Sequence, residues 1–378
     1  KTKAKRKDEI AIQMIQSLYD LEEIAYSQMS QMAATYFRGG SRDEITLRMN
    51  RATWDKMHLW YRVLVDVSQR DCSTSVLGTE LSAPVLIAPT AFHGLAHQDA
   101  ESATVRAAGA FGTIACISTL SNVSLETLAE DATRPLWFQL YVYKDSEITK
   151  SLVQRAEAAG YKAIVLTVDA AEIGTREGDQ QTSFHLPSTL EIANLKASGL
   201  NSLHRIESGS ALAKYVRDML DPSVTWSDVE WLRTQTQLPI VIKGIIHPDD
   251  ATRAMNCGAA AVIVSNHGGR QLDTAPPTSM ALPHIVEAIA GEIDVLVDGA
   301  IRRGTDIVKA LALGAKAVLV GRPIIWGLAY DGQTGVETTL GLLRSELLEA
   351  MALCGCPTIG DISSALLSPV KDSGRSIS

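Results

Sequence analysis

The chain has 378 residues, enough for one large or two average domains, and 46% of them are apolar, which allows a large buried core. Its formal net charge of −8, from 35 basic and 43 acidic residues, argues against a nucleic-acid partner and leaves room only for local basic pockets. The five cysteines lack zinc or Cys-x-x-Cys spacing and no apolar run is long enough to cross a membrane, so we expect a soluble cytoplasmic protein without a metal site.

The N-terminal part predicts a helical segment ahead of the main fold. From about Asp8 to Phe37, apolar residues recur at three- and four-residue spacing, which is typical of an amphipathic helix. The pair Gly39-Gly40 follows and ends the helical pattern. We expect a single domain over residues 1–378, in which residues 8–81 form this helical extension and residues 82–367 form the main fold.

From Ser82 onward, a short apolar run alternates eight times with a longer amphipathic or alanine-rich segment. Short apolar runs rich in β-branched residues are typical of buried parallel strands, and the segments between them are typical of helices. The alternation predicts a (β/α)8 TIM barrel, with a doubly wound open sheet as the less favoured alternative. The predicted strands are residues 85–88, 114–117, 137–140, 163–168, 240–243, 261–265, 295–298 and 317–321. The predicted helices are residues 100–111, 153–160, 249–258, 282–291 and 305–314.

The interval between the fourth and fifth predicted strands, residues 170–239, is too long for an ordinary connection in a barrel. Its first part, residues 177–209, is polar and poor in regular pattern. Long connections of this kind often cover a binding site. We therefore expect an inserted lid after the fourth strand, and an insertion that serves subunit contacts is the alternative.

The residues that follow the predicted strands are candidates for function, because barrel enzymes carry their active sites at the carboxyl ends of the strands. Most of these residues are polar or small. In chain order they are Pro89, Thr90, Ala91, Ser118, Gln139, Tyr141, Thr167, Asp169, Lys243, Ser265, His267, Asp298, Gly299, Gly321 and Arg322.

Two loops predict a phosphate site. Residues 298–305 follow the seventh predicted strand and Gly321-Arg322-Pro323 follows the eighth, which are the loops that bind phosphate in many barrels. Glycine amides with Arg302 and Arg322 could hold the phosphate, while Asp298 could accept hydrogen bonds from sugar-alcohol hydroxyls. The phosphate and ribityl chain of FMN fit, and a sugar-phosphate substrate would fit as well. No Gly-x-Gly-x-x-Gly follows a strand, so we expect no separate nicotinamide domain.

The nine residues 265–273, Ser-Asn-His-Gly-Gly-Arg-Gln-Leu-Asp, directly follow the sixth predicted strand. They combine an acid or base in His267, a backbone that can approach a ligand closely, and a carboxylate-binding fork in Arg270. This string resembles the signature of the FMN-dependent 2-hydroxy-acid oxidases and dehydrogenases, a family that includes lactate oxidase, glycolate oxidase and mandelate dehydrogenase. The resemblance extends from about Leu18 to about Leu367, with its motifs in the same order.

The resemblance implies FMN as cofactor and a defined set of site residues. His267 would be the catalytic base, oriented by Asp169, and Arg270 with Arg176 would bind the substrate carboxylate. Tyr36 and Tyr141 would complete the contacts to the carboxylate and hydroxyl. The implied cofactor-binding residues are Pro89, Thr90, Ala91, Ser118, Gln139, Thr167, Lys243, Ser265, Asp298, Gly299, Arg302, Gly321 and Arg322. The role of Lys243 also has a physical basis, because a cation near the pyrimidine end stabilises the charge of the reduced flavin.

The expected reaction is oxidation of a small L-2-hydroxy acid, most similar to L-lactate, with O2 reduced to hydrogen peroxide. His93-Gly94-Leu95-Ala96-His97 resembles lactate oxidase, whereas Leu120 stands where glycolate and lactate oxidases have a large aromatic and so indicates a wider pocket. Mandelate, 4-hydroxymandelate or glycolate oxidation, a lactate 2-monooxygenase and a quinone-linked dehydrogenase remain alternatives. The insertion carries charges throughout, unlike the membrane-anchored dehydrogenases, and family members are commonly tetramers or octamers, so we expect a homo-oligomer away from membranes.

Two other classes of flavin-binding protein remain as alternatives. An FMN barrel isomerase acting on a prenyl diphosphate would share the phosphate site but would not need His267, Arg270 and Arg176 together. A catalytically silent flavin-binding protein would be expected to lack the base or one of these arginines, and the sequence contains all three.

Overall fold

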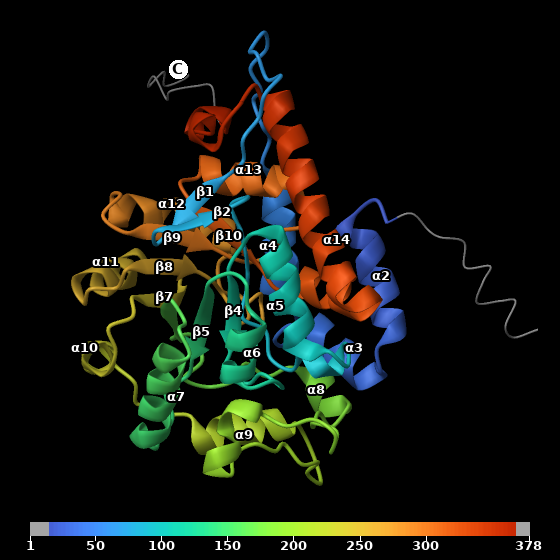
Figure 1. The fold of residues 1–378 in the computed structure, drawn as a ribbon, viewed down its shortest axis with the longest axis vertical. Helices are drawn as coiled ribbons and strands as arrows, with labels where there is room; N and C mark the ends of the chain where they lie inside the picture. The colour runs from blue at the N-terminus through green and yellow to red at the C-terminus, as the bar shows by residue number, and fades with distance from the viewer. Residues whose placement is uncertain (1–14, 368–378) are drawn as a thin grey trace, which may run out of the picture.

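The computed structural model describes residues 15–367, and its core is a closed barrel of eight parallel strands (Figure 1). The last strand pairs with the first through residues Val318 and Val85, so the barrel has no open edge. The strands are β3 (Val85–Ile87), β4 (Ala115–Ser118), β5 (Leu136–Leu140), β6 (Ala163–Thr167), β7 (Ile240–Ile245), β8 (Ala261–Val264), β9 (Asp294–Val297) and β10 (Ala317–Val320). The predicted TIM barrel is confirmed, and each predicted run overlaps one of these strands, with ends that differ by at most two residues.

Side chains fill the inside of the barrel, so it is a core rather than a channel. Trp137 and Ile263 belong to this inner cluster, and both are fully buried. A small hairpin of β1 (Thr74–Val76) and β2 (Thr79–Leu81) adds Val76 and Leu81 to the same cluster. The hairpin lies at the amino ends of the strands, where the Leu77 amide donates to Asp294 at the start of β9. That end is closed by apolar packing, which leaves the carboxyl end for a site.

Helices form the outer layer of the barrel. They are α5 (Ala100–Phe111), α6 (Leu125–Asp131), α7 (Ser146–Ala158), α10 (Trp226–Gln235), α11 (Pro248–Asn256), α12 (Thr278–Ile289), α13 (Gly304–Ala312) and α14 (Arg322–Cys354). The five predicted helices are all present, whereas α6, α10 and α14 were not predicted. The seven residues of α6 show too little periodicity to be recognised. Helix α14 is kinked at Asp331 and Gly332, whose backbone angles are not helical. No helix of residues 15–367 is long and apolar enough to cross a membrane.

The N-terminal segment differs from its prediction as one helix from Asp8 to Phe37. Its described part contains two helices, α2 (Leu18–Gln28) and α3 (Gln31–Arg38), and residues 8–14 lie outside the described range. The break has a local cause, because the Ser30 hydroxyl accepts the Ala33 amide at 3.2 Å and starts a new helix. Helix α3 ends at the predicted glycines, and α4 (Ile45–Lys56) follows them.

The interval 170–239 contains α8 (Glu177–Gln181), the 3-10 helix η2 (Ala193–Ser198), α9 (Ala211–Met219) and α10. Helix α10 belongs to the outer layer beside β7, whereas α8 and α9 extend beyond the strands at one end of the molecule (Figure 1). The buried Asn194 fastens this segment to the loop after β4. Its amide nitrogen donates to the Thr119 carbonyl at 3.1 Å, and its oxygen accepts the Leu125 amide at 2.8 Å. The insertion therefore has its own secondary structure and a fixed anchor on the barrel.

Helix α4 is joined to the first turn of α13 by a two-point ion pair. Arg51 donates to both carboxylate oxygens of Asp306, at 2.6 and 2.8 Å, and Asp306 is 1% exposed. The same carboxylate accepts the backbone amides of Arg302 and Arg303 at 2.9 and 3.0 Å. Asp306 therefore shapes a loop that carries one of the candidate phosphate-binding arginines.

Removing this carboxylate should destabilise the protein much more than removing the second partner of Arg51. Asp306→Ala removes the buried counter-charge of a partly buried guanidinium and leaves two backbone amides without an acceptor, and we expect it to lower the free energy of unfolding by about 3 kcal/mol. Asp55→Ala, at a carboxylate that also contacts Arg51 but is 62% exposed, should cost less than about 1 kcal/mol. Urea denaturation of the two variants measures the difference, and equal losses would contradict it.

Candidate active site

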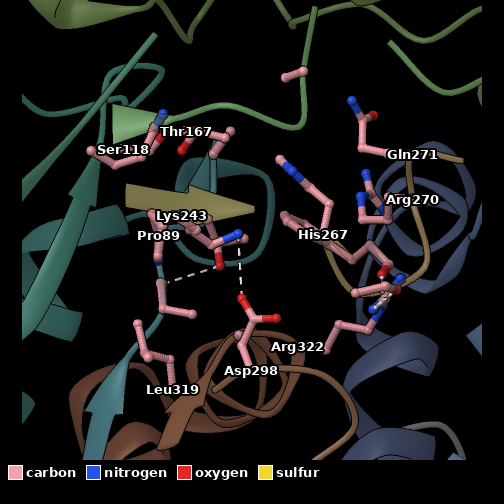
Figure 2. Close-up of a pocket in the computed structure, with 18 of the residues that line it drawn as sticks. Pro89, Ser118, Thr167, Lys243, His267, Arg270, Gln271, Asp298, Leu319 and Arg322 are labelled. Carbon is pink, nitrogen blue, oxygen red and sulfur yellow. Dashed lines mark hydrogen bonds and ion pairs between the residues drawn. The ribbon is translucent and has the colours of Figure 1, made fainter. Parts of the chain in front are cut away.

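A cavity opens at the carboxyl ends of the strands, between the barrel, helix α3 and the insertion. Residues from all parts of the chain meet there, and Figure 2 shows several of them projecting toward the same space. The predicted site residues that line it are Tyr36, Pro89, Thr90, Ala91, Ser118, Gln139, Tyr141, Thr167, Arg176, Lys243, His267, Arg270, Asp298, Gly299, Arg302, Gly321 and Arg322. Asp169 and Ser265 do not line the cavity but lie directly behind residues that do.

His267 lies at the start of a sharp turn after β8. It has a φ of 58°, and Gly268 and Gly269 continue with φ values of 65° and 76°. Left-handed backbone is uncommon for a residue with a side chain, and such residues often occur at functional sites. A side chain on Gly269 would come within 2.6 Å of the Leu47 Cα, so glycine is required there. The turn is held by Ser265, whose hydroxyl accepts the His267 amide at 3.0 Å.

The imidazole of His267 is oriented by Asp169, which follows β6. The distance from His267 Nδ1 to Asp169 Oδ1 is 2.8 Å, and only 12% of the Asp169 side chain is exposed. With Nδ1 engaged by a carboxylate, Nε2 is the nitrogen available for a proton from a ligand. Burial alone would raise the pKa of Asp169, but the His267 contact and the Lys243 cation lower it below its usual value. Asp169 is therefore a carboxylate throughout the neutral range.

Lys243 lies in the cavity wall at the end of β7 and is 4% exposed. Its ammonium donates to the Ser265 hydroxyl at 3.0 Å and lies 3.3 Å from Asp298 Oδ2, as Figure 2 shows for the contact with Asp298. Ser265 in turn donates to Asp298 at 2.9 Å. Burial would lower the pKa of Lys243, but Asp298 and Asp169 outweigh this effect and raise it. Lys243 is therefore a fixed cation in the wall.

Several polar atoms of the lining residues have no hydrogen-bond partner among residues 15–367. They are Gln139 Nε2, Thr167 Oγ1 and Asp298 Oδ1, each fully buried within the described structure. Leaving a buried polar group without a hydrogen bond costs roughly 1–3 kcal/mol. A donor, a hydroxyl and an acceptor that all belong to the lining of one cavity indicate a bound molecule with hydrogen-bonding groups of both kinds.

A cationic corner is formed by Arg270 and Arg176, which both lie close to the ring of Tyr36. Their guanidinium carbons lie 4.8 and 5.6 Å from the centre of the Tyr36 ring. Arg270 is held by the backbone carbonyls of Tyr36 and Gly39, at 2.7 and 2.8 Å. Burial and the neighbouring Arg176 lower the pKa of Arg270 to about 10, which still leaves it charged at neutral pH. Two cations this close are suited to an anion between them.

Arg176 has a buried counter-charge that the sequence did not reveal. Its Nε donates to Asp179 at 2.7 Å, and the two side chains are 6% and 2% exposed. Asp179 thus occupies the Nε edge of the guanidinium and leaves the terminal nitrogens for another partner. The three-residue spacing of Arg176 and Asp179 is a signal that could have suggested the pair, because it is a common spacing for contacts in a helical turn.

A second cationic corner lies near the start of α14. Arg322 donates to the carbonyls of Phe37 and Gly268 at 2.8 and 2.9 Å, and Arg302 stacks 4.6 Å from the Trp326 ring. Burial lowers the pKa of both arginines. Arg303 is different, because it turns away to Glu346 and does not line the cavity. The two predicted arginines therefore lie in the cavity wall with glycine backbone at Gly299 and Gly321.

The sequence did not identify the apolar part of the wall. Beside Leu120, it includes Ile173, Leu212, Val216 and Leu220, which all come from the insertion. Leu212 and Val216 are four residues apart on α9, so the spacing on a helix begun by Ser210 was the available signal. The wall contains no aromatic side chain at these five positions.

Gln271 was likewise not singled out. Its side chain donates to the carbonyls of Asp169 and Glu172 at 2.6 and 2.9 Å, and accepts the Gly174 amide at 3.0 Å. It therefore joins the loop after β8 to the loop after β6, and holds Asp169 close to His267.

Known proteins of one kind resemble this chain over nearly its whole length. The family model described as FMN-dependent dehydrogenase matches residues 25–369. An L-lactate oxidase of Nostoc sp. is 51% identical over 356 residues, covering 93% of this chain and 97% of the relative. Human 2-hydroxyacid oxidase 1 is 46% identical over 351 residues, which cover 92% of this chain and 95% of the relative. A mandelate oxidase whose crystal structure contains (S)-4-hydroxymandelic acid is 42% identical in sequence. The two structures superpose with a TM-score of 0.88 over 91% of this chain and 96% of the other.

The contact between Asp169 and His267 should make stability depend on acid pH. A carboxylate whose pKa is lowered by folding contributes stability above its unfolded pKa of about 3.9 and loses it as the pH falls through the lower folded value. We expect Asp169→Asn to have a lower free energy of unfolding than the wild type near pH 7. The difference between the two proteins should become smaller below about pH 4. Urea denaturation of both proteins across this pH range measures the difference. A difference in the free energy of unfolding that does not change with pH would refute the contribution of the ionised Asp169.

Proposed function

The chain belongs to the FMN-dependent dehydrogenase family, and we propose that it oxidises an L-2-hydroxy acid to the 2-oxo acid with O2 as electron acceptor and hydrogen peroxide as the second product. The observation that carries this proposal is the hydrogen bond between His267 and Asp169, next to two arginines that line the same cavity. The oxidase names of the relatives at 51% and 46% identity support an acceptor of this kind.

The residues present fit FMN. The unpartnered atoms of Gln139 and Thr167, with the Lys243 cation, match the hydrogen-bonding edge of a flavin, and Asp298 Oδ1 is free to accept from a sugar-alcohol hydroxyl. Arg302 and Arg322, with the backbone of Gly299 and Gly321, match the phosphate. Pro89, Thr90, Ala91 and Ser118 complete the proposed cofactor wall, and Ser265 acts through Lys243. Bound there, FMN supplies a two-electron acceptor next to the substrate.

The proposed roles of the chain's own residues follow from their contacts. Arg270 and Arg176 bind the substrate carboxylate, since both present free guanidinium nitrogens to the cavity. His267 Nε2 takes the proton of the 2-hydroxyl group as the α-carbon becomes a carbonyl, and Asp169 stabilises the resulting imidazolium. Burial raises the pKa of Tyr141 well above 10, so it stays neutral and can donate a hydrogen bond to the substrate, as can Tyr36.

Two substrate classes are supported by different observations. The identity to an L-lactate oxidase supports L-lactate or a close analogue. The aliphatic wall of Leu120, Leu212 and Val216 supports a larger apolar side chain, such as the ring of mandelate, because no aromatic residue at those positions occupies the space. We propose lactate-like acids as the principal substrates and aryl acids as the second class.

We also propose a cytoplasmic homo-oligomer, a tetramer or an octamer. The five cysteines of the chain are all free, which supports a reducing compartment. Trp60, Tyr61, Val63 and Leu64 lie on the surface, with 55%, 67%, 69% and 104% of each exposed. A run of exposed apolar side chains is typical of a surface that another protein covers, and a second copy of this chain is the partner we propose.

The absorbance spectrum of the holoenzyme tests the reaction. Recorded without oxygen, the flavin bands should bleach on addition of L-lactate, with glycolate and L-mandelate ranking the alternatives, and should recover in air as peroxide forms. Bleaching without recovery would indicate a dehydrogenase with another acceptor. A bound flavin that no hydroxy acid reduces would refute the proposed roles of His267 and Arg270.

The Asp179 carboxylate should matter for binding rather than for the chemical step. Asp179→Ala frees the guanidinium of Arg176, and we expect KM to rise about tenfold while the rate of bleaching at saturating substrate changes little. Asp179→Asn keeps an oxygen that can accept a hydrogen bond from Arg176, so its KM should lie between those of the wild type and Asp179→Ala. Glu177→Gln, an exposed change on the same helix, is the control. Steady-state kinetics decide, and a fall in the limiting rate with KM unchanged would show that the assignment is wrong.

A further inference from the structure

A second cavity of about 440 Å³ lies beside the first. Four residues line both cavities, Tyr141, Thr167, Ala170 and Leu220, so a single layer of side chains separates them. The second cavity also reaches Gly244, where a side chain would lie 2.7 Å from the Asp169 Cβ. It therefore lies directly behind the pair of His267 and Asp169. For this reason we call it the side cavity.

The walls of the side cavity are set by barrel elements and by the end of the insertion. Leu220 pairs with Tyr143, and the Asp221 amide donates to the Val142 carbonyl at 3.0 Å. The facing wall comes from the end of β7 and from Val229 on α10, which is 2% exposed. The partition toward the active site includes Ala170, whose side chain is the smallest of the four shared ones.

The two cavities differ in charge. The main cavity is lined by Arg176, Arg270 and Lys243, among other cations, whereas none of the residues 15–367 that line the side cavity is a lysine, arginine or histidine. Its charged residues are both acidic, Asp221 and Asp250, and most of the others are apolar. A hydroxy-acid anion would meet like charge and no cation on this route. A small neutral, apolar molecule would meet no such barrier.

We propose that the side cavity binds dioxygen and conducts it to the active site, separately from the approach of the anionic substrate. This rests on the proposed oxidase function. Dioxygen takes up two electrons from reduced FMN and two protons and leaves as hydrogen peroxide, and the hydroxy acid is the reductant that restores reduced FMN. Dioxygen is neutral and apolar, which matches a chamber lined by Val142, Val168, Val224 and Ile245.

Xenon tests binding without any turnover, because this apolar gas occupies apolar cavities in proteins. Crystals of the holoenzyme pressurised with xenon should show it in the side cavity. In Val224→Trp, at a residue that lines the side cavity and not the main one, the indole should displace it. A side cavity that holds ordered water and no xenon would overturn the proposal.

Rapid kinetics test the passage. In Val224→Trp, the rate of anaerobic bleaching by the hydroxy acid should match the wild type, while the second-order rate constant for reoxidation by O2 should fall severalfold. Met280→Trp, which places the same indole at a residue of α12 that is 52% exposed and outside both cavities, should alter neither rate.

Each other outcome has a distinct meaning. Unchanged reoxidation in Val224→Trp, or an equal fall in both rates, would overturn the passage even if xenon binds. If no hydroxy acid bleaches the wild type, the proposed oxidase function fails, and with it the passage, whereas the xenon measurement still reports whether the cavity takes up an apolar gas.

Discussion

The site depends on a buried alternation of charges at the ends of four neighbouring strands. Lys243 at the end of β7 is stabilised by Asp298 after β9 and by Asp169 after β6, and Ser265 after β8 joins the first pair by hydrogen bonds. A buried lysine with no carboxylate nearby would be costly and would tend to lose its proton. Strand register brings the groups together, since Thr167 pairs with Lys243, and Lys243 with Ile263. The barrel thus aligns the cation and its two anions without any loop rearrangement.

The remaining cations of the cavity are not balanced in this way. Arg270, Arg302 and Arg322 donate mainly to backbone carbonyls, which are neutral, and burial lowers the pKa of each. Only Arg176 has a carboxylate of its own in Asp179. The cavity therefore holds an excess of positive charge in two corners. That excess suits two separate anions, the phosphate of a cofactor and the carboxylate of a substrate.

His267, the proposed base, combines a left-handed backbone with support from several segments. Its left-handed backbone is held by Ser265, its ring by Asp169, and the loop of Asp169 by Gln271. The same loop forms the partition to the side cavity. The position of Asp169 thus bears both on the orientation of the base and on the wall between a cationic and an acidic chamber.

The sequence by itself determined the barrel and most of the residues at its rim, because both depend on local patterns. Short apolar runs mark buried parallel strands, and the residue after each run must lie at the carboxyl end. Only the tertiary structure decided which of those side chains face the cavity and which support them, as for Ser265, which lies behind Lys243. Arg270 meets the carbonyl of Tyr36, 234 positions away, and the apolar wall comes from α9 in the insertion. Such contacts depend on how distant segments pack, and spacing within one segment shows an apolar face without showing what that face meets.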